Sequence, residues 1–461
     1  MQLNISRQAA NYLKYLLPFL ICIFGDISFY TFWRNDLGPH ISPVIFTLFG
    51  IGVGITFFRI LFAGYKGKFQ YDRKLPSVTG KPQRYTYAYL ILIPLLAYWY
   101  FELSGVFQSL PIDFDTNPFK TRSDVIPNVM SYVKKTVNGE FPYQPIRGKE
   151  WTYELMPTYL TMTWLPYIPA ELLHADYRWV PVIALTICIL VYYRQSIPLK
   201  SNPLFFWLAF IAPILFLYLQ TKFNIEDFKL TVEGLVTAYY LLLAFALGKK
   251  KYTWIVLMVL LCLLSRFSLL FWLPLLVLVV WQEYSIRYVY KGILAIAAGI
   301  VLLYGIFMIK DPNIFINAVR YYSSATVGEW TIADWLKEQG GQHPFSLSRG
   351  TGWAIWFYDY LDGTLEEKIA ILKKVQLIIV SATTLVLCWH YWRHRMHTNG
   401  WLYALGSLKI SLVVFYAFIQ IPYAYLYILP VFLNLPMLIY GLKILNGELQ
   451  PVSATKPDHH Q

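Results

Sequence analysis

Apolar runs long enough to cross a lipid bilayer recur along this chain, and they constrain its fold more than any other feature. An α-helix of roughly 20 residues crosses the ~30 Å hydrocarbon layer and pairs its own backbone polar groups. Charged residues make up 14% of the 461-residue sequence, against roughly 25% in soluble domains. We therefore expect an all-α polytopic membrane protein with about 12 transmembrane helices. The predicted spans are 12–33, 42–64, 86–105, 179–193, 203–219, 230–248, 252–264, 268–282, 288–308, 369–392, 401–420 and 423–442.

Basic residues in the short loops indicate how the chain is oriented. The loop between the second and third spans has six basic residues and one acid, Asp72. Cytoplasmic loops carry such an excess of Lys and Arg, so we expect this loop and the N-terminus inside. We ascribe the net charge of +13 to such loops and to anionic lipid headgroups rather than to nucleic-acid binding. The first apolar run has no small-residue cleavage site after it and is interpreted as a retained span.

A polar segment, 107–157, interrupts the apolar runs and is expected on the outer face. From Val125 to Val137 its apolar residues follow the i, i+4, i+7, i+8 spacing of an amphipathic helix. Pro127 falls in the first turn of this helix, and Gly139 lies where a C-terminal cap belongs. We predict a helix that lies on the membrane surface and holds Asp124 at its start.

The next segment, 156–173, contains Pro157, Pro166 and Pro169 and leaves the crossing pattern open. Prolines interrupt helical hydrogen bonding, so this segment either spans the membrane poorly or returns to the side from which it came. If it crosses, the basic run 249–251 lies outside; if it does not, that run lies inside. The excess of basic residues in cytoplasmic loops favours the second case.

A second long polar segment, about 309–368, carries more acidic than basic residues and is also expected outside. Its basic residues could meet a phosphate, although a single His in a loop is more often an ordinary loop residue. Its Trp and Tyr residues fit either sugar stacking or an interfacial aromatic belt, and the belt is favoured for most of them.

Asp124 is the best-placed candidate for catalysis. A carboxylate near the membrane surface can act as a general base if it reaches the attacking hydroxyl, and a helix start fixes its position. The competing explanation is that Asp is a favoured N-cap, which accounts for Asp124 without any chemistry. Asp113 and Asp115 fit a turn or weakly suggest a cation site, because hard cations need several oxygen ligands.

Arg266 and Glu233 are charged residues within or at the edge of predicted spans. Such charges are costly and often functional. Arg266 suits a lipid-linked phosphate through charge-assisted hydrogen bonds, and the alternative is an interfacial Arg that extends to water. Glu233 has the alternative of pairing with Lys229 one turn earlier.

Several common motifs are missing from the sequence. It contains no phosphate-binding glycine loop, GxSxG, HExxH or CxxC pattern, which argues against ATP-driven transport and soluble-type hydrolase chemistry. No internal repeat and no soluble domain is visible. The cysteines lie in separate apolar runs and are interpreted as small buried hydrophobes: Cys22, Cys188, Cys262 and Cys388.

The sequence SDVIPNVMSYVKKTVNGEFPYQPI, followed by WTYELMPTYLTMTWLPYIP, resembles the first outer loop of GT-C superfamily glycosyltransferases. It looks most like the polyprenol-phosphate-mannose-dependent branch. The matching positions are Asp124, Tyr132, Gly139, Pro142, Tyr143, Tyr153, Pro157 and Tyr159. The LLSRFSLLFWLP stretch is similar to a short helix pair of that family, with Arg266 where a basic residue often falls. One proline replaces the tandem prolines of the family and two extra spans precede the match, so the sugar stays open.

The resemblance implies a GT-C-like bundle whose catalytic module is 86–310. It also implies inverting transfer of mannose or another hexose from a polyprenyl-phosphate donor to a glycan or glycolipid acceptor, with Asp124 as general base. The remaining predicted units are an N-terminal pair of spans with a basic loop (1–85), a second outer loop (311–368), and C-terminal spans with a cytoplasmic tail (369–461). The default location is a bacterial inner membrane with the site facing outward.

The predicted site residues fall into two groups. Donor-phosphate binding is assigned to Arg266, Arg320, His343 and Arg349, and sugar or acceptor binding to Tyr143, Tyr153, Tyr159, Glu226, Asp227 and Glu233. The need for a divalent cation stays open. The competing functions are a transporter or flippase of lipid-linked sugars, and an O-antigen-type ligase or polymerase. A transporter often shows internal repeats, and a ligase is expected to depend on Arg and His of its outer loop.

Overall fold

The computed structural model describes residues 2–68, 86–112, 123–146 and 154–449. Within these ranges the secondary structure is helical apart from one β-bridge, between Ile146 and Leu155. Nine helices of the described chain are long and apolar enough to cross a membrane, and three shorter apolar helices accompany them. Each predicted span overlaps one of these helices, so the prediction of an all-α polytopic membrane protein is confirmed.

The nine long segments are Tyr12–Trp33, Ser42–Tyr65, Ala88–Ser109, Trp179–Leu199, Pro203–Phe223, Ile286–Met308, Leu365–His397, Gly400–Ala417 and Ala424–Leu445. Glu233–Gly248, Tyr252–Leu263 and Phe267–Glu283 are the shorter ones. The individual elements are α1 (Gln2–Ser28), η1 (Phe29–Trp33), α2 (Ser42–Tyr65), α3 (Thr86–Leu90), α4 (Leu92–Ser109), α6 (Val125–Val137), α7 (Thr161–Trp164), η3 (Leu165–Tyr167), α8 (Ile168–Leu172), α9 (Trp179–Ser196), η4 (Ile197–Ser201), α10 (Pro203–Phe223), α11 (Glu226–Lys229), α12 (Glu233–Gly248), α13 (Tyr252–Leu263), η5 (Phe267–Trp272), α14 (Leu273–Glu283), α15 (Ile286–Ile300), η6 (Val301–Gly305), α16 (Ile306–Met308), α17 (Ile314–Trp330), α18 (Asp334–Glu338), α19 (Phe345–Ser348), α20 (Ala354–Tyr360), α21 (Leu365–His394), η7 (Arg395–His397), α22 (Gly400–Ala417), η8 (Ala424–Tyr427), α23 (Ile428–Phe432) and α24 (Asn434–Leu445).

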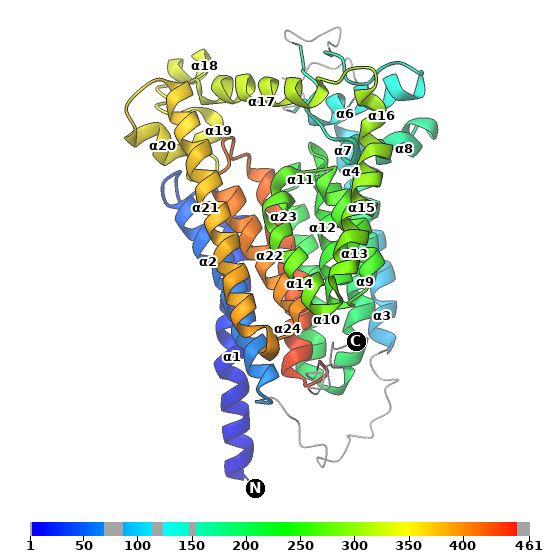
Figure 1. The fold of residues 1–461 in the computed structure, drawn as a ribbon, viewed down its shortest axis with the longest axis vertical. Helices are drawn as coiled ribbons and strands as arrows, with labels where there is room; N and C mark the ends of the chain where they lie inside the picture. The colour runs from blue at the N-terminus through cyan, green and yellow to red at the C-terminus, as the bar shows by residue number, and fades with distance from the viewer. Residues whose placement is uncertain (1, 69–85, 113–122, 147–153, 450–461) are drawn as a thin grey trace.

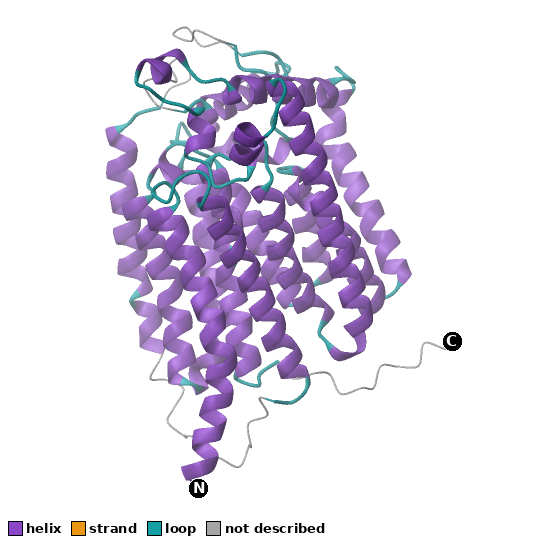
Figure 2. Cartoon of the chain, turned by 90° about the vertical axis from the view of Figure 1, so that its left-hand side faces the viewer, coloured by secondary structure: helices purple, strands orange, loops and turns teal. Residues whose placement is uncertain are grey.

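The long helices stand side by side, and the short helices gather at one end of them. Figure 1 shows the N-terminus at the opposite end from α6, α7, α8 and α17 to α20, and Figure 2 shows the same arrangement from the side. The described parts of 110–178 and 309–364, which form this end, are termed the cap. The two polar segments predicted to share one face therefore lie together.

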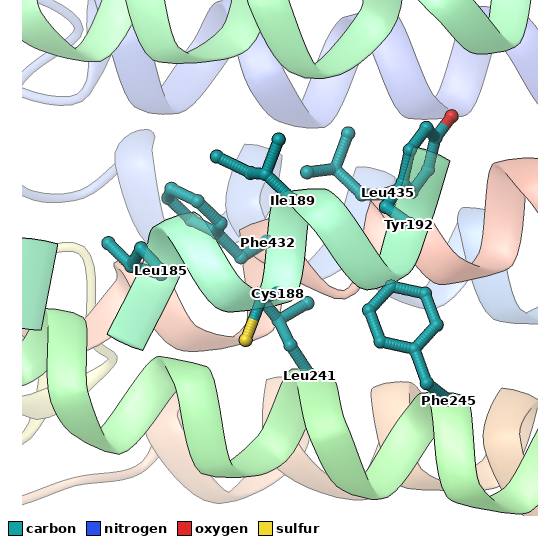
Figure 3. Close-up of a pocket in the computed structure, with 8 residues that line it drawn as sticks. All are labelled: Leu185, Cys188, Ile189, Tyr192, Leu241, Phe245, Phe432 and Leu435. Atoms are coloured by element: carbon teal, nitrogen blue, oxygen red, sulfur yellow. The ribbon is translucent and has the colours of Figure 1, made fainter. Parts of the chain in front are cut away.

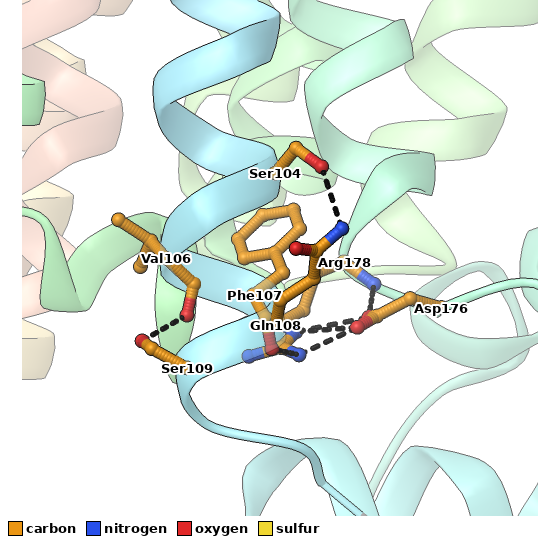
Figure 4. A network of polar contacts seen from close by, with 7 residues as sticks. All are labelled: Ser104, Val106, Phe107, Gln108, Ser109, Asp176 and Arg178. Carbon is orange, nitrogen blue, oxygen red and sulfur yellow. Dashed lines mark hydrogen bonds and ion pairs between the residues drawn. The ribbon is translucent and has the colours of Figure 1, made fainter.

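The proline-rich segment 156–173 does not form a spanning helix. It folds into three consecutive short helices of four, three and five residues, α7, η3 and α8. Arg178, just before α9, donates a hydrogen bond of 2.8 Å to the carbonyl oxygen of Phe107 near the end of α4, and it also pairs with Asp176 (Figure 4). The chain thus returns to the end that it left at α4, as the loop charges predicted.

The bundle is organised around its C-terminal helices. In the apolar 18-residue windows of 400–417 and 424–445, 94% and 100% of the residues are buried, whereas in that of 286–308 only 11% are buried. Gly50 of α2 allows a close approach to α22, because a Cβ atom there would lie 2.6 Å from a methyl group of Val413. The weakly buried helices are left to face lipid.

The predicted helix 125–137 is present with the predicted limits, but its environment differs from the prediction. Gly139 has φ +75°, and the amide of Glu140 donates to the carbonyl of Lys135 at 2.7 Å, which closes the helix as expected. Every residue from 125 to 133 is buried, so α6 is enclosed in the cap instead of lying on a surface. The hydrophobic pattern did not reveal that cap residues also cover the polar side of the helix.

Candidate functional site

An ion pair joins the turn after α13 to the first residue of α12. Arg266 Nη2 donates to Glu233 Oε1, and the two side chains are 21% and 1% exposed. The amide of Glu233 donates to the Thr231 hydroxyl at 3.3 Å, which helps to fix the start of α12. A carboxylate at a helix N-terminus is also favoured by the helix dipole. The alternative partner proposed for Glu233, Lys229, is replaced by Arg266.

Asp124 occupies the N-cap position of α6, but its carboxylate makes no capping hydrogen bond. Ser123 serves that end of the helix instead, because its hydroxyl accepts from the amide of Val125 at 3.3 Å. The same hydroxyl donates to the carbonyl of Leu230 at 2.8 Å, three residues before Glu233. The structure therefore removes capping as the explanation for Asp124 and places it beside the turn that leads to Glu233.

Two further hydrogen bonds hold the cap on the Arg266 turn. The amide of Met162 donates to the carbonyl of Leu264 at 2.9 Å, and the Thr163 hydroxyl donates to the carbonyl of Ser265 at 3.2 Å. The amide of Tyr159 donates to the hydroxyl of Tyr132, in α6, at 3.2 Å. Residues from the first polar segment and from the α13–η5 turn are thereby fixed against each other.

Tyrosines surround these charged groups. Burial raises the pKa of Tyr159, the negative charge of Asp124 raises it further, and Arg266 lowers it. Burial raises the pKa of Tyr322, in α17, to about 12, with Arg266 lowering it and Glu329 raising it. Both phenols are therefore protonated at neutral pH and can donate hydrogen bonds. Tyr159 lies within electrostatic reach of both Asp124 and Arg266.

A second carboxylate, Glu329, reaches this region from the end of α17. Its Oε1 accepts a hydrogen bond of 2.8 Å from the hydroxyl of Tyr423. Burial raises the pKa of Tyr423, and the charges of Glu329 and Asp124 raise it further. The neighbouring Trp330 donates to the carbonyl of Gln420 at 2.8 Å, so the end of α17 is anchored to the turn before η8. The sequence analysis missed Glu329 because a single acid in a loop has no distinguishing spacing.

Several buried polar atoms of the ion pair and of the nearby helices have no hydrogen-bond partner among the described residues. They belong to α6, α7, α12 and the Arg266 turn, and Thr237 lies one turn below Glu233. Buried polar groups are usually satisfied by protein, water or ligand. The atoms are Asn128 Oδ1, Ser131 Oγ, Thr161 Oγ1, Thr237 Oγ1, Glu233 Oε2 and Arg266 Nε. This part of the molecule therefore offers hydrogen-bonding capacity to a polar ligand.

Two residues predicted to bind sugar are buried and make contacts within the protein. Tyr143 is buried in an aromatic cluster and accepts a hydrogen bond of 3.4 Å from Trp164. Asp227 is buried, accepts from the Tyr30 hydroxyl at 2.7 Å and lies 3.6 Å from Arg34. Burial raises the pKa of Asp227, and Arg34 opposes that shift. Sequence position alone could not show that these side chains point into the protein.

The other predicted ligands lie elsewhere on the cap, in α11 or outside the described residues. Glu226 and Arg320 are exposed, Arg349 lies over the ring of Phe345 at 4.6 Å, and His343 Nε2 contacts Asp359 at 3.1 Å. The described residues contain no group of His, Cys, Asp and Glu arranged to hold a metal ion. Asp113, Asp115 and Tyr153 lie outside the described residues.

Two cavities of the described chain are distinct from this cluster. One is an apolar space of about 10 Å³ within the bundle, beside Cys188, Tyr192 and Phe432 (Figure 3). An apolar space of that size holds at most one water-sized sphere, so it is a packing defect. The other, about 510 Å³, lies along Phe107, Met130 and other residues of α4, α6 and the α8–α9 turn. Neither is lined by Asp124, Arg266 or Glu233.

The charged cluster thus combines three sequence-predicted residues with one that was missed. Arg266 and Glu233 form an ion pair at the junction of cap and bundle. Asp124 lies nearby, because its neighbour Ser123 donates to Leu230 and its charge acts with that of Arg266 on the phenol of Tyr159. Glu329 approaches through its hydrogen bond with Tyr423. Comparison with protein-family models, with curated proteins and with solved structures finds no match to this chain.

Proposed function

We propose that this protein is an integral membrane glycosyltransferase that moves a hexose from a polyprenyl-phosphate donor to a glycan or glycolipid acceptor. The observation that carries the proposal is that hydrogen bonds hold the Asp124 end of α6 and the start of α7 against the two turns that carry the Glu233–Arg266 pair. A carboxylate, a cation and several hydroxyl donors are the groups that such a transfer requires. The resemblance to the mannose-transferring branch of the GT-C superfamily makes mannose the first sugar to test.

The proposed reaction is a single inverting displacement. The acceptor hydroxyl oxygen attacks the anomeric carbon, and its proton passes to the carboxylate of Asp124. The bond from the anomeric carbon to the phosphate oxygen breaks, and its electron pair leaves with the polyprenyl phosphate. Arg266 stabilises the negative charge on that leaving group, while Glu233 keeps the guanidinium in place.

The depth of Arg266 supports a donor that stays in the membrane. α13 has 12 residues, which gives a length of about 18 Å at 1.5 Å per residue. The hydrocarbon layer is roughly 30 Å thick, so the turn with Arg266 ends below the level that a full-length span reaches. A lipid phosphate close to the membrane surface can meet this turn without a nucleotide pocket.

The proposed topology has about 12 crossings, formed by the nine long segments and the three shorter helices. The N-terminus and the run Lys249–Lys251 then face the cytoplasm, and the cap faces outward. This orientation agrees with the basic residues at the end opposite the cap. A bacterial inner membrane is the proposed location.

Transfer from a polyprenyl-phosphate donor by the purified full chain tests the function. Polyprenyl-phosphate mannose and glucose are supplied with a panel of glycan and glycolipid acceptors. Asp124→Asn is expected to lower kcat by about 10²- to 10⁴-fold, because general-base catalysis contributes that much. The matched control is Asp334→Asn, which removes a well-exposed carboxylate of the cap.

The outcome that overturns the proposal is full activity in Asp124→Asn. A wild-type protein that moves lipid-linked sugars across liposome membranes without transferring any sugar also overturns it, in favour of a flippase. Loss of transfer in Arg349→Gln with retention in Asp124→Asn would indicate a ligase that depends on its outer loop.

A further inference from the structure

Lys373 is a cation on a membrane-spanning helix that points toward the cap. It lies in α21, within the span Leu365–His397, and is half-buried. Its Nζ donates to the hydroxyl of Ser323, in α17, at 3.0 Å. The side chain is therefore held by a cap helix and is not simply extended along the outside of α21.

The described chain supplies no carboxylate to balance this charge. No Asp or Glu among the described residues lies within ion-pair distance of Lys373, whereas Lys409 in the neighbouring helix α22 has Asp26 at 2.6 Å. A charged side chain within a span is costly unless it meets an opposite charge or water. Lys373 is only partly exposed and has Ser323 as its one polar partner within the described chain, so an anionic ligand can bind to its ammonium group.

Helix α17 contacts both Lys373 and the residue that follows Arg266. Ser323 follows Tyr322, whose phenol feels the charge of Arg266. At the other end of α17, Phe315 packs edge-on against Phe267, the residue after Arg266, with ring centroids 5.7 Å apart. Figure 1 shows α17 lying across the end of the bundle.

Helix α21 and η5 are also in contact with each other below α17. The hydroxyl of Thr384, in α21, donates to the carbonyl of Phe271, in η5, at 2.8 Å. Helix α21 and the element that follows Arg266 are therefore packed against each other. The two cations stand on neighbouring elements beneath the same cap helix.

We propose that Lys373 is the second cation of the lipid-phosphate site and binds the phosphate of the polyprenyl donor together with Arg266. This inference rests on the proposed function for its biological meaning, but the binding of a polyprenyl phosphate can be measured without sugar transfer. Lys373 thus adds a cation to the residues predicted from the sequence to bind the donor phosphate, Arg266, Arg320, His343 and Arg349. The apolar tail then leaves along α21, only 28% of whose apolar window is buried.

The test compares Lys373→Gln with Lys374→Gln, its exposed neighbour on the same helix. The full chain in nanodiscs is titrated with decaprenyl phosphate, and separately with phosphatidylglycerol, and bound lipid is counted by native mass spectrometry. Lys373→Gln is expected to raise the Kd for decaprenyl phosphate at least about 10-fold, the size of one lost charge-assisted hydrogen bond. Lys374→Gln and Lys373→Arg are expected to stay within about two-fold of the wild type, because each keeps the cation beneath α17.

Equal decaprenyl phosphate affinity in Lys373→Gln and Lys374→Gln overturns the inference. So does a loss confined to phosphatidylglycerol, which would make Lys373 a contact for bulk phospholipid. A matching thermal unfolding midpoint for Lys373→Gln and the wild type shows that the measured affinities belong to folded protein. If Lys373 binds decaprenyl phosphate and no sugar is transferred by the wild type, the inference stands and the proposed function fails. In an active enzyme, Lys373→Gln raises the KM for the donor and leaves the KM for the acceptor unchanged.

Discussion

The ion pairs Lys409–Asp26 and Arg266–Glu233 differ in how their cations are satisfied. Lys409 and Asp26 are both 0% exposed, and the ammonium donates to Asp26 Oδ2 at 2.6 Å and to the Pro430 carbonyl at 2.7 Å. Arg266 is 21% exposed, and its Nε has no partner among the described residues. Each pair leaves one carboxylate oxygen without a partner in the described chain, so the difference lies in the cation.

This difference separates a structural pair from a functional one. The Asp26–Lys409 pair joins α1 to α22, and Asn434 at the start of α24 donates to the same Asp26 oxygen at 2.8 Å. Nothing can enter it without parting those helices. Arg266 keeps donor capacity that a phosphate can use while Glu233 still holds the guanidinium. We term Lys409–Asp26 the closed pair, because both side chains are fully buried, and it fixes the bundle. We term Arg266–Glu233 the half-open pair, because Arg266 is 21% exposed, and it can bind an anion.

The largest effect is expected from breaking the closed pair. Lys409→Met leaves Asp26 buried without a counter-ion, which costs about 3–5 kcal/mol when one partner of a buried pair is removed. The protein is expected to unfold at a markedly lower temperature, measured by the loss of a monodisperse gel-filtration peak on heating in detergent.

The double variant Asp26→Asn/Lys409→Met sharpens this test, because it removes both charges. Replacing a buried pair by neutral residues is often nearly neutral in free energy. Recovery of most of the lost stability is therefore expected. If the single and double variants unfold at the same temperature, the cost lies in packing rather than in the uncompensated charge.

The sequence predicted the helices of this bundle far better than its ion pairs. The span 12–33 and the helix 125–137 match their observed limits because apolar periodicity is a local property. Asp26 and Lys409 stand 383 positions apart, and a single charge in an apolar run carries no sign of its partner. The rule that charges within spans are seldom incidental could have drawn attention to both.

Site residues could be predicted where a local sequence feature distinguished them. They could not be predicted where tertiary packing determines whether a side chain is buried. Asp124 and Arg266 were distinguished by a helix start and an interrupted apolar run. Tyr143 and Asp227 looked like ligands because they lie in polar segments, yet tertiary packing buries both. Lys373 was assigned to an ordinary span, and only α17 lying above it shows its special position.

The variants Arg266→Lys and Lys409→Arg test whether the first ion pair serves activity and the second serves stability. Arg266→Lys keeps the charge but loses the planar group that can hold Glu233 and a phosphate at once, so kcat/KM for the donor is expected to fall about 10-fold or more. Its thermal unfolding midpoint is expected to change little. Lys409→Arg adds volume to a closed site and is expected to cost about 1–3 kcal/mol of stability, while the activity per folded molecule is retained. The opposite result, in which Arg266→Lys loses stability and Lys409→Arg loses activity, would show that Lys409 has the functional role and Arg266 the structural one.

A smaller effect is expected at Glu329, which approaches the site only through Tyr423. Glu329→Gln removes one charged acceptor that an acceptor hydroxyl can use, and such a hydrogen bond contributes about 1.5–3 kcal/mol. Because Glu329 is partly exposed, the lower end applies, and the KM for the acceptor is expected to rise roughly 10-fold. Donor KM is the internal control. A change in donor KM alone would place Glu329 at the phosphate instead.

The smallest effect is expected at a third pair, Arg34–Asp227, which is intermediate between the other two because its side chains are 9% and 3% exposed. The pKa of Asp227 is raised by burial, so the folded protein keeps this proton to a higher pH than the unfolded chain does. The contribution of this group to stability is therefore complete below the ordinary pKa of an Asp and is lost as the pH rises through the folded pKa. Asp227→Asn should remove this loss of stability with rising pH, because the amide does not titrate. It keeps the side-chain volume and an oxygen that accepts from Tyr30.

The measurement is the difference in unfolding midpoint between the wild type and Asp227→Asn from pH 3 to pH 7, since all other carboxylates cancel in that difference. The variant is expected to gain relative to the wild type as the pH rises, superimposed on a constant loss from its weaker contact with Arg34. A difference that is flat with pH would mean that Arg34 fully offsets the burial of Asp227, as in a closed pair. A difference that moves the other way would mean that Arg34 dominates and that Asp227 is ionised in the folded protein even below its ordinary pKa.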